Sequence, residues 1–90
     1  MYVIKKDGTK EAYNVQKVVT AVNKSAFRAL VRFSEEDIQF ICDFVNKKVA
    51  AMNKDFISIS EMHNVVEYAL ESLNPAVAKS YKDYRNYKQD

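Results

Sequence analysis

The 90-residue chain contains one glycine, Gly8, and this count restricts both its folds and its ligand sites. A P-loop needs several glycines because its backbone wraps phosphate groups at positive φ, and a dinucleotide-binding fingerprint needs three. Both motifs are excluded, so any bound nucleotide must be held in another way. Gly8 follows Asp7 between two short runs of strand-forming residues, 2–6 and 9–13. This pattern predicts a β-hairpin with a two-residue type I′ turn.

The expected turn also predicts a register for the hairpin. With a two-residue loop, Ile4 lies opposite Glu11 and Lys5 lies opposite Lys10. Because side chains alternate along a strand, Ile4 and Glu11 then share one face, and Val3 and Lys5 share the other. An isolated hairpin is marginal in water, so it is expected to pack on the rest of the chain.

Apolar residues at helical spacing predict four helices after the hairpin. Residues typical of helix N-caps precede the expected helices, and they are Asn14, Ser34, Ser60 and Asn74. The helices are expected at 15 to about 30, 35 to about 53, 61–73 and from Pro75 onward. A short β-branched run at 56–59 is expected to form a third strand beside the hairpin. The predicted order is therefore hairpin, helix, helix, short strand, helix, helix.

The composition is that of one ordinary globular domain, with 48% hydrophobic and 29% charged residues. The formal net charge of +2 is too even to require nucleic acid as a partner. Apolar runs are too short to span a membrane and the N-terminus lacks the order of a signal peptide, so a cytoplasmic location is expected. A charged helical pattern continues to the last residue, which indicates the N-terminal part of a longer protein.

Few residues are suited to catalysis. His63 is the single histidine and Cys42 the single cysteine, so neither has a partner of its own kind for a metal site or a disulfide. Cys42 lies in an apolar helical stretch and is expected to be a buried, inert thiol. No acid–base pair stands out. The chain is expected to be neither an enzyme nor a metal-binding protein in its own right.

Lysines are clustered near the start of the chain, at positions 5, 6, 10 and 17. An ammonium group is a compact charge suited to phosphate oxygens, and the start of the helix at Val15 would offer free N–H groups to an anion. A triphosphate near this junction is one interpretation. The other is that these lysines are solvated charges that protect an edge strand from aggregation.

Two motifs give the chain a resemblance to a known family. The first is Val3-Ile4-Lys5-Lys6-Asp7-Gly8 with Glu11, Tyr13-Asn14 and Lys17-Val18, and the second is Val77-Ala78 with Tyr81 and Tyr84-Arg85. Together they resemble the ATP-cone family, and the ending is most similar to that of anaerobic, class III ribonucleoside-triphosphate reductases. Lys6 stands where arginine is common, which loses bidentate phosphate geometry.

The resemblance implies an α+β fold, in which a four-helix bundle is capped by a small sheet and the hairpin acts as a lid. It implies an allosteric domain, residues 1–90, that binds ATP or dATP with Mg²⁺ and controls the overall activity of a ribonucleotide reductase. Its partners would be the catalytic domain or other subunits, with homo-oligomers left open. The implied contacts are Val3, Ile4 and Glu11 with the base, Asn14 and His63 with ribose or phosphates, and Lys5, Lys6, Lys17 and Lys88 with phosphates.

Two alternatives remain at this point. ATP-cones also occur in a nucleotide-responsive transcriptional repressor, although that protein carries a cysteine-rich zinc ribbon that this chain lacks. A small basic helical nucleic-acid-binding module is the other, because tyrosines alternate with Lys and Arg between Lys79 and Lys88. Asp83 interrupts that run, so nucleic acid is the less favoured partner.

Overall fold

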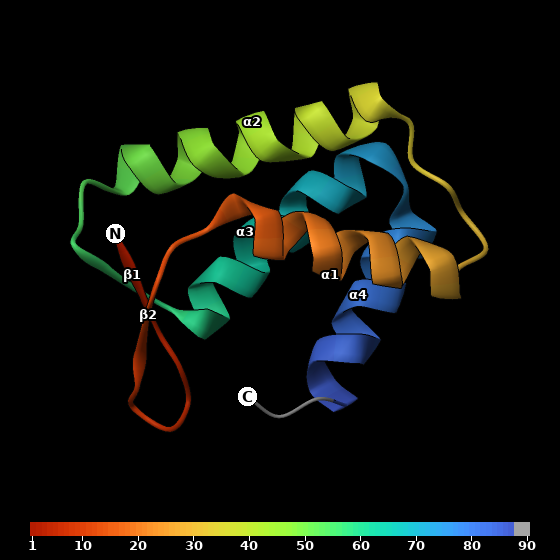
Figure 1. The fold of residues 1–90 in the computed structure, drawn as a ribbon. Helices are drawn as coiled ribbons and strands as arrows, with labels where there is room; N and C mark the ends of the chain where they lie inside the picture. Colours follow the sequence, from red (N-terminus) through yellow and green to blue (C-terminus); the bar gives the residue numbers. More distant parts are fainter. Residues whose placement is uncertain (88–90) are drawn as a thin grey trace.

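The computed structural model describes residues 1–87, which form four helices and a three-stranded sheet (Figure 1). Along the chain the elements are β1 (Tyr2–Ile4), β2 (Lys10–Ala12), α1 (Val15–Arg28), α2 (Glu35–Met52), β3 (Phe56–Ser58), α3 (Ile59–Leu73) and α4 (Pro75–Tyr87). The order of elements and the α+β class agree with the prediction. Lys88, a predicted phosphate contact, lies outside the described residues.

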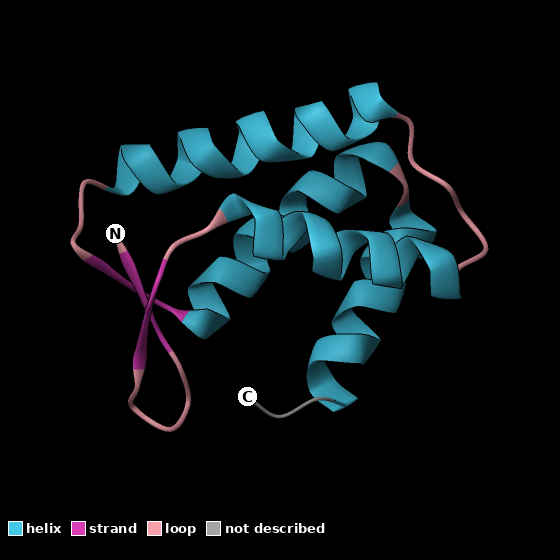
Figure 2. Cartoon of the chain, viewed as in Figure 1, coloured by secondary structure: helices cyan, strands magenta, loops and turns pink. Residues whose placement is uncertain are grey.

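The three strands lie together at one end of the helices (Figure 2). The strand order is β2-β1-β3, with β1 and β2 antiparallel and β1 and β3 parallel. The backbone N–H of Tyr2 donates to the carbonyl of Asp55 at 2.8 Å, which aligns the incoming β3 chain with β1. The predicted third strand is therefore confirmed beside the hairpin, and it leads directly into α3.

The hairpin register differs from the predicted one by one residue. Ile4 lies opposite Lys10 and Val3 opposite Glu11, because the loop has three residues, 6–8, rather than two. The Gly8 N–H donates to the Lys5 carbonyl at 3.0 Å, and Gly8 alone in the loop has a positive φ, +87°. This is the three-residue loop in which a β-turn is followed by a glycine in the left-handed region. A type I′ turn would also need positive φ at Asp7, which the chain does not adopt.

The side chain of Asp7 explains the choice of loop. Its carboxylate accepts hydrogen bonds from the Thr9 hydroxyl at 2.6 Å and from the Thr9 N–H at 3.0 Å. These bonds lower the pKa of Asp7 below its ordinary value, the hydroxyl being the larger cause. An aspartate that bonds the backbone two residues ahead stabilises this turn locally.

The register decides which side chains face the helices. A shift of one residue moves every side chain of a strand to the other face. Glu11 therefore lies on the same face as Val3 and Lys5, and Ile57 from β3 extends that face into the core. Lys10 lies on the opposite face, where its ammonium is 5.0 Å from the centre of the Tyr2 ring. The predicted faces of Glu11 and Lys10 were wrong for this reason.

Helix starts follow the N-cap residues with one exception. Asn14, Ser34 and Asn74 each accept a backbone N–H of the first turn that follows, and Ser34 forms a capping box with Asp37. The exception is α3, whose N-cap is Ser58 rather than Ser60.

The side chain of Ser58 accepts the N–H of Glu61 at 3.1 Å. Its position is explained by the glutamate three residues on, which is the spacing of a capping box. The strand therefore ends and the helix begins without an intervening loop, so Ile59 belongs to α3 and not to the strand.

The core is built from the apolar stripes of the four helices together with the inner face of the sheet. α3 packs against α4 and α2, α1 packs against α4 and α2, and α3 also contacts β1 and β3. Fully buried side chains include Val22 of α1, Ile41 of α2, Leu70 of α3 and Val77 of α4. One polar bridge joins α4 to α1, where the Ser80 hydroxyl donates to the Ser25 carbonyl at 2.9 Å. Burial of these stripes places the sheet against α3 and leaves α1 beside the hairpin.

Cys42 is half-buried on α2, so it is less enclosed than the sequence predicted. Among the described residues, no helix has the length and apolar character needed to cross a membrane.

α1 ends earlier than predicted, at Arg28, and its end is strained. The Val31 N–H donates to the Ala26 carbonyl at 2.8 Å, and the Leu30 N–H to the Phe27 carbonyl at 3.1 Å, which is a Schellman ending. Its left-handed position, usually glycine, is occupied by Leu30 with φ +58°. Leu30 is 94% exposed, so its side chain gains almost nothing from packing.

Replacing Leu30 by glycine should therefore stabilise the domain. We expect Leu30→Gly to raise the free energy of unfolding by about 0.5–1 kcal/mol, because it removes the steric cost of a left-handed leucine. Urea unfolding followed by circular dichroism measures the change. Asn53→Gly is the matched control, since Asn53 also has a positive φ, 50°, but asparagine tolerates that region. A destabilised Leu30→Gly, or equal shifts in both variants, would contradict this reading.

Candidate functional site

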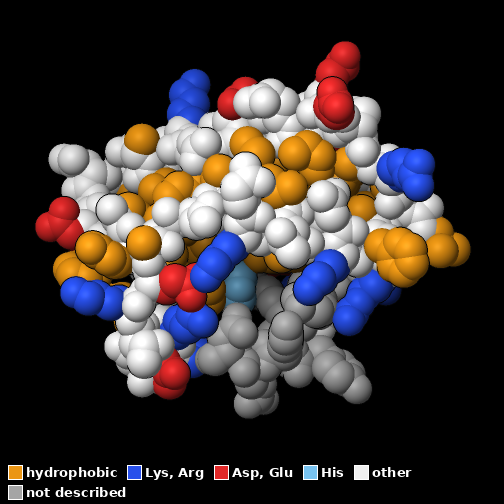
Figure 3. Space-filling model, in the orientation of Figure 1, with side chains coloured by type: hydrophobic (Ala, Val, Ile, Leu, Met, Phe, Trp, Pro, Cys, Tyr) orange, Lys and Arg blue, Asp and Glu red, His pale blue; other side chains and the backbone are white. Residues whose placement is uncertain are grey.

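A cavity of about 460 Å³ lies between the hairpin, α1, α3 and α4. Its volume is within the usual range for a small-molecule site. In Figure 3 the only histidine of the chain is visible in a hollow flanked by Lys, Arg and acidic side chains. The lining residues are Val3, Lys5, Glu11, Ala12, Tyr13, Asn14, Gln16, Lys17, Val18, Thr20, Ala21, Lys24, Ile59, Met62, His63, Val66 and Tyr81.

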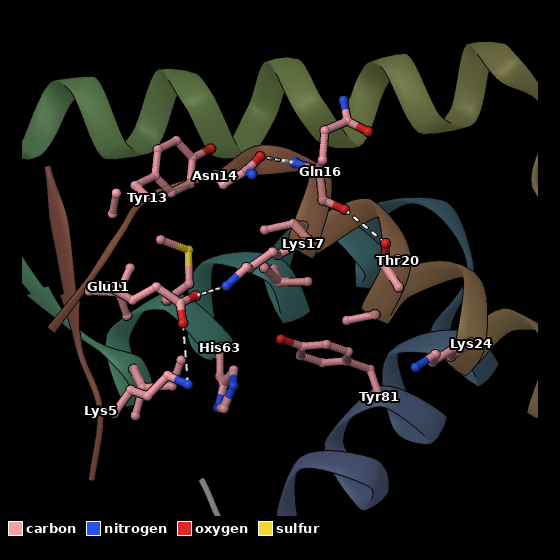
Figure 4. Close-up of a pocket in the computed structure, with 17 residues that line it drawn as sticks. Lys5, Glu11, Tyr13, Asn14, Gln16, Lys17, Thr20, Lys24, His63 and Tyr81 are labelled. Carbon is pink, nitrogen blue, oxygen red and sulfur yellow. Dashed lines mark hydrogen bonds and ion pairs between the residues drawn. The ribbon is translucent and has the colours of Figure 1, made fainter. Parts of the chain in front are cut away.

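Glu11 is the central charged group of the cavity (Figure 4). Its carboxylate accepts a hydrogen bond from the Lys17 ammonium and forms an ion pair with Lys5 at 3.3 Å. Lys5 comes from the end of β1, Glu11 from β2 and Lys17 from the first turns of α1. One carboxylate therefore joins the sheet to the helix, and it does so only because the three-residue loop turns Glu11 inward.

The charges of the cavity are mainly positive. Among the residues that the structure describes, the lining contains three lysines and one glutamate, which gives a formal charge of +2 with His63 neutral. The Lys17 ammonium, and after it that of Lys5, holds the pKa of the Glu11 carboxyl below its ordinary value. Glu11 is consequently ionised at neutral pH, and its single negative charge is shared between Lys5 and Lys17.

The N-terminus of α1 adds further positive potential. Asn14 caps this helix by accepting the Gln16 N–H at 2.9 Å, and the first turn contains no acidic residue. The first turn of α2, by contrast, contains Glu35, Glu36 and Asp37. A helix start attracts anions. The start of α1, which has Glu11 as its nearby carboxylate, should therefore attract an anionic ligand more strongly than the start of α2.

Tyr13 fixes the connection between β2 and α1. Its hydroxyl donates to the Asn46 side chain of α2 at 2.6 Å, and burial raises its pKa above the ordinary value. Its ring lines the same cavity as Asn14. The hydrogen bond to α2 thus fixes the junction between β2 and α1 on one side, and the other side of this junction faces the cavity.

His63 and Tyr81 form the opposite wall. Their ring centres are 5.9 Å apart and the ring planes lie at 83°, an edge-on arrangement. His63 is half-buried and Tyr81 is buried, and both side chains lie across the cavity from Glu11 in Figure 4. Tyr81, a residue of the second motif, both packs in the core and lines the cavity.

The structure brings together six of the nine predicted site residues, and these are Val3, Lys5, Glu11, Asn14, Lys17 and His63. Ile4 and Lys6 do not line the cavity. Ile4 points to the other face of the sheet by alternation, and Lys6 stands exposed in the turn. The assignment of all nine residues to the ligand stays a prediction, and Lys88 lies outside the described residues.

The sequence interpretation missed several lining residues on α1. Thr20, Ala21 and Lys24 follow Lys17 at spacings of three, four and seven, which place them on one helical face. That spacing is a signal that was available in the sequence. Met62 and Val66 from α3 carry no such signal, because only the packing of α3 on the sheet places them in the cavity.

The lining combines charged and apolar side chains. Within the part of the chain that the structure describes, no group of three His, Cys, Asp or Glu side chains could hold a metal ion. Cys42 does not line the cavity. What the lining offers is a combination of lysine ammonium groups with apolar side chains, which suits an anion attached to an apolar ring.

A cavity of this size on a four-helix α+β fold is typical of a small ligand-binding domain. The chain belongs to the ATP-cone family, since the ATP cone domain matches residues 1–90. It is accordingly a nucleotide-binding regulatory domain. It is also 30% identical over 89 residues to an anaerobic ribonucleoside-triphosphate reductase of Haemophilus influenzae. That alignment covers 93% of this chain and 12% of the relative, so the chain spans a small part of that protein's length.

The ion pairs of Glu11 predict an acid-dependent stability. Because the folded-state pKa lies below the ordinary value of 4.5, the ionised carboxylate stabilises the fold above that value, and this contribution is lost as the pH falls through the folded-state pKa. The effect is modest, since the side chain is 34% exposed. Glu11→Gln should therefore lose less unfolding free energy on acidification than the unmodified chain. Urea unfolding from pH 7 to pH 3 measures both slopes, and parallel curves would exclude the assigned stabilisation.

Proposed function

We propose that this chain is the allosteric domain through which ATP and dATP control the overall activity of a ribonucleotide reductase. The observation that carries the proposal is the convergence of Lys5 and Lys17, from two separate elements, in one cavity with an apolar wall. The name of the Haemophilus influenzae relative supports a reductase rather than a transcriptional repressor as the parent protein.

The triphosphate is proposed to lie at the junction of hairpin and α1. Lys5 and Lys17 supply ammonium groups there, and Lys24 lies farther along the same face of α1. The N–H groups in the first turn of α1 add hydrogen-bond donors, which is how helix starts bind phosphate in general. Mg²⁺ is expected to arrive with the triphosphate, because its charge calls for a counter-ion.

The base is proposed to occupy the apolar side of the cavity. Val3 and Val18 are buried behind it, and Met62 and Val66 contribute from α3. Burial of a flat ring against these side chains supplies affinity that does not depend on charge. Asn14 and His63, which lie at the polar margin, are proposed to contact the ribose or the phosphates.

Regulation is proposed to follow from linkage. A ligand shifts an equilibrium only by its differential affinity for two states, and a coupling of about 1–3 kcal/mol is typical of such switches. ATP and dATP differ by one ribose hydroxyl, so that hydroxyl must change how the domain meets the catalytic part of the reductase or another subunit. Residues 1–90 would form the N-terminal domain of that cytoplasmic protein.

The proposed phosphate contacts of Lys5 and Lys17 can be tested by substitution. We expect Lys5→Ala combined with Lys17→Ala to weaken ATP binding by about a hundredfold or more, because two charged hydrogen-bond donors are removed. Isothermal titration calorimetry measures the affinity, and circular dichroism checks that the helices persist.

Lys54→Ala is the matched control for this experiment. Lys54 also faces a carboxylate, that of Glu61 at 3.9 Å, but it does not line the cavity. The control should bind ATP as the unmodified chain does. Equal affinities in the control and in the folded double variant would remove the lysines from the site and refute the proposal.

A further inference from the structure

The arrangement of charges in the cavity bears on how a ligand enters. The cations best placed for phosphate groups, Lys5 and Lys17, both contact Glu11 in the ligand-free chain. Each contact with Glu11 uses part of the hydrogen-bonding capacity of an ammonium group, so a polyphosphate that binds there competes with the carboxylate for both lysines. It also cannot approach closely without repulsion, since Glu11 is itself an anion.

We propose that Glu11 is the counter-anion of Lys5 and Lys17 until the phosphate groups of a ligand displace it. The displacement lowers the affinity for every polyanion, and base-free polyphosphates are excluded because they cannot recover this loss. This inference rests on the proposed function of the same cavity. It assigns Glu11 a role in selecting the ligand class, in addition to any contact with the bound base.

The geometry makes the exchange feasible. The three side chains are partly exposed, with 37% of Lys5, 61% of Lys17 and 34% of Glu11 open to solvent. Ion pairs of this exposure are weak, so a ligand with several negative charges can replace the carboxylate. Lys5 directly follows β1, Glu11 lies on β2 and Lys17 on α1. The carboxylate can therefore leave by side-chain rotation without unfolding an element.

The apolar wall explains which ligands overcome the threshold. Every polyanion must displace Glu11, and this lowers the affinity for all of them. A nucleotide recovers the loss by burying its ring against Val3, Val18 and Met62, whereas a bare polyphosphate has no apolar surface to bury. The cavity is therefore expected to discriminate against inorganic polyphosphates while accepting nucleotides.

The test uses tripolyphosphate as a base-free probe on the 90-residue chain. Glu11→Gln should raise the affinity for tripolyphosphate by about tenfold or more, because the competing anion is removed and the amide keeps the shape. Isothermal titration calorimetry at constant ionic strength measures this change in tripolyphosphate affinity. Glu61→Gln is the control, since it removes the same charge from a lysine-paired glutamate outside the cavity. Its tripolyphosphate affinity should match that of the unmodified chain.

A gain in affinity cannot arise from a damaged fold, so the result separates selection from a structural role. A folded Glu11→Gln with unchanged or weaker tripolyphosphate binding would overturn the inference, as would an equal gain in both variants. ATP binding by the unmodified chain is measured in parallel, and its absence would count against the proposed function but not against the exchange.

A second measurement needs no variant. The pKa of Glu11 can be followed through its carboxyl carbon by NMR, with and without saturating ATP. Exchange predicts that the pKa rises when phosphates take the lysines, because Glu11 then loses two cationic partners and gains anionic neighbours. The other ionisable side chains that line the cavity besides Lys5 and Lys17 are Tyr13, Lys24, His63 and Tyr81, and His63 is followed in the same spectra. A Glu11 pKa unchanged by ATP would contradict the exchange.

Discussion

The contact of one carboxylate with two ammonium groups connects the sheet of this protein to its first helix. Glu11 reaches Lys5 and Lys17 because the loop at Gly8 has three residues, which turns Glu11 toward the helices. With a two-residue loop the same glutamate would face away, and the cavity would lose the only acidic group that the described residues give it. The contact of Glu11 with both lysines thus depends on whether the hairpin loop has two or three residues.

Much of the fold could be predicted from local sequence signals. Asn14, Ser34 and Asn74 cap helices as expected, and the apolar stripes supply the core. The hairpin register could not be predicted, because Asp-Gly suits both a type I′ turn and the longer loop. What separates them is the φ of Asp7 and its bonds to Thr9, a small energetic difference that the dipeptide alone does not reveal.

The candidate site, like the fold, could be predicted from the sequence only in part. The motif that resembles the family pointed to Lys5, Glu11 and Lys17, and all three line the cavity. It did not indicate that these residues contact one another before any ligand arrives. Nor did it indicate the wall formed by Met62 and Tyr81, because α3 and α4 reach the hairpin only through tertiary packing. Strand alternation likewise sets Ile4 apart from Val3, its neighbour in the motif.

The most direct test of the central claim is the position of the phosphates. ATP loaded with Mn²⁺ broadens NMR signals of nearby protons, so amide spectra locate the triphosphate in the protein. The account predicts the strongest broadening at the amides of Lys5, Glu11 and Lys17, and none at Phe40 on α2, which does not line the cavity. Broadening centred elsewhere, or equal at all of these positions, would contradict the placement of the triphosphate between the hairpin and α1.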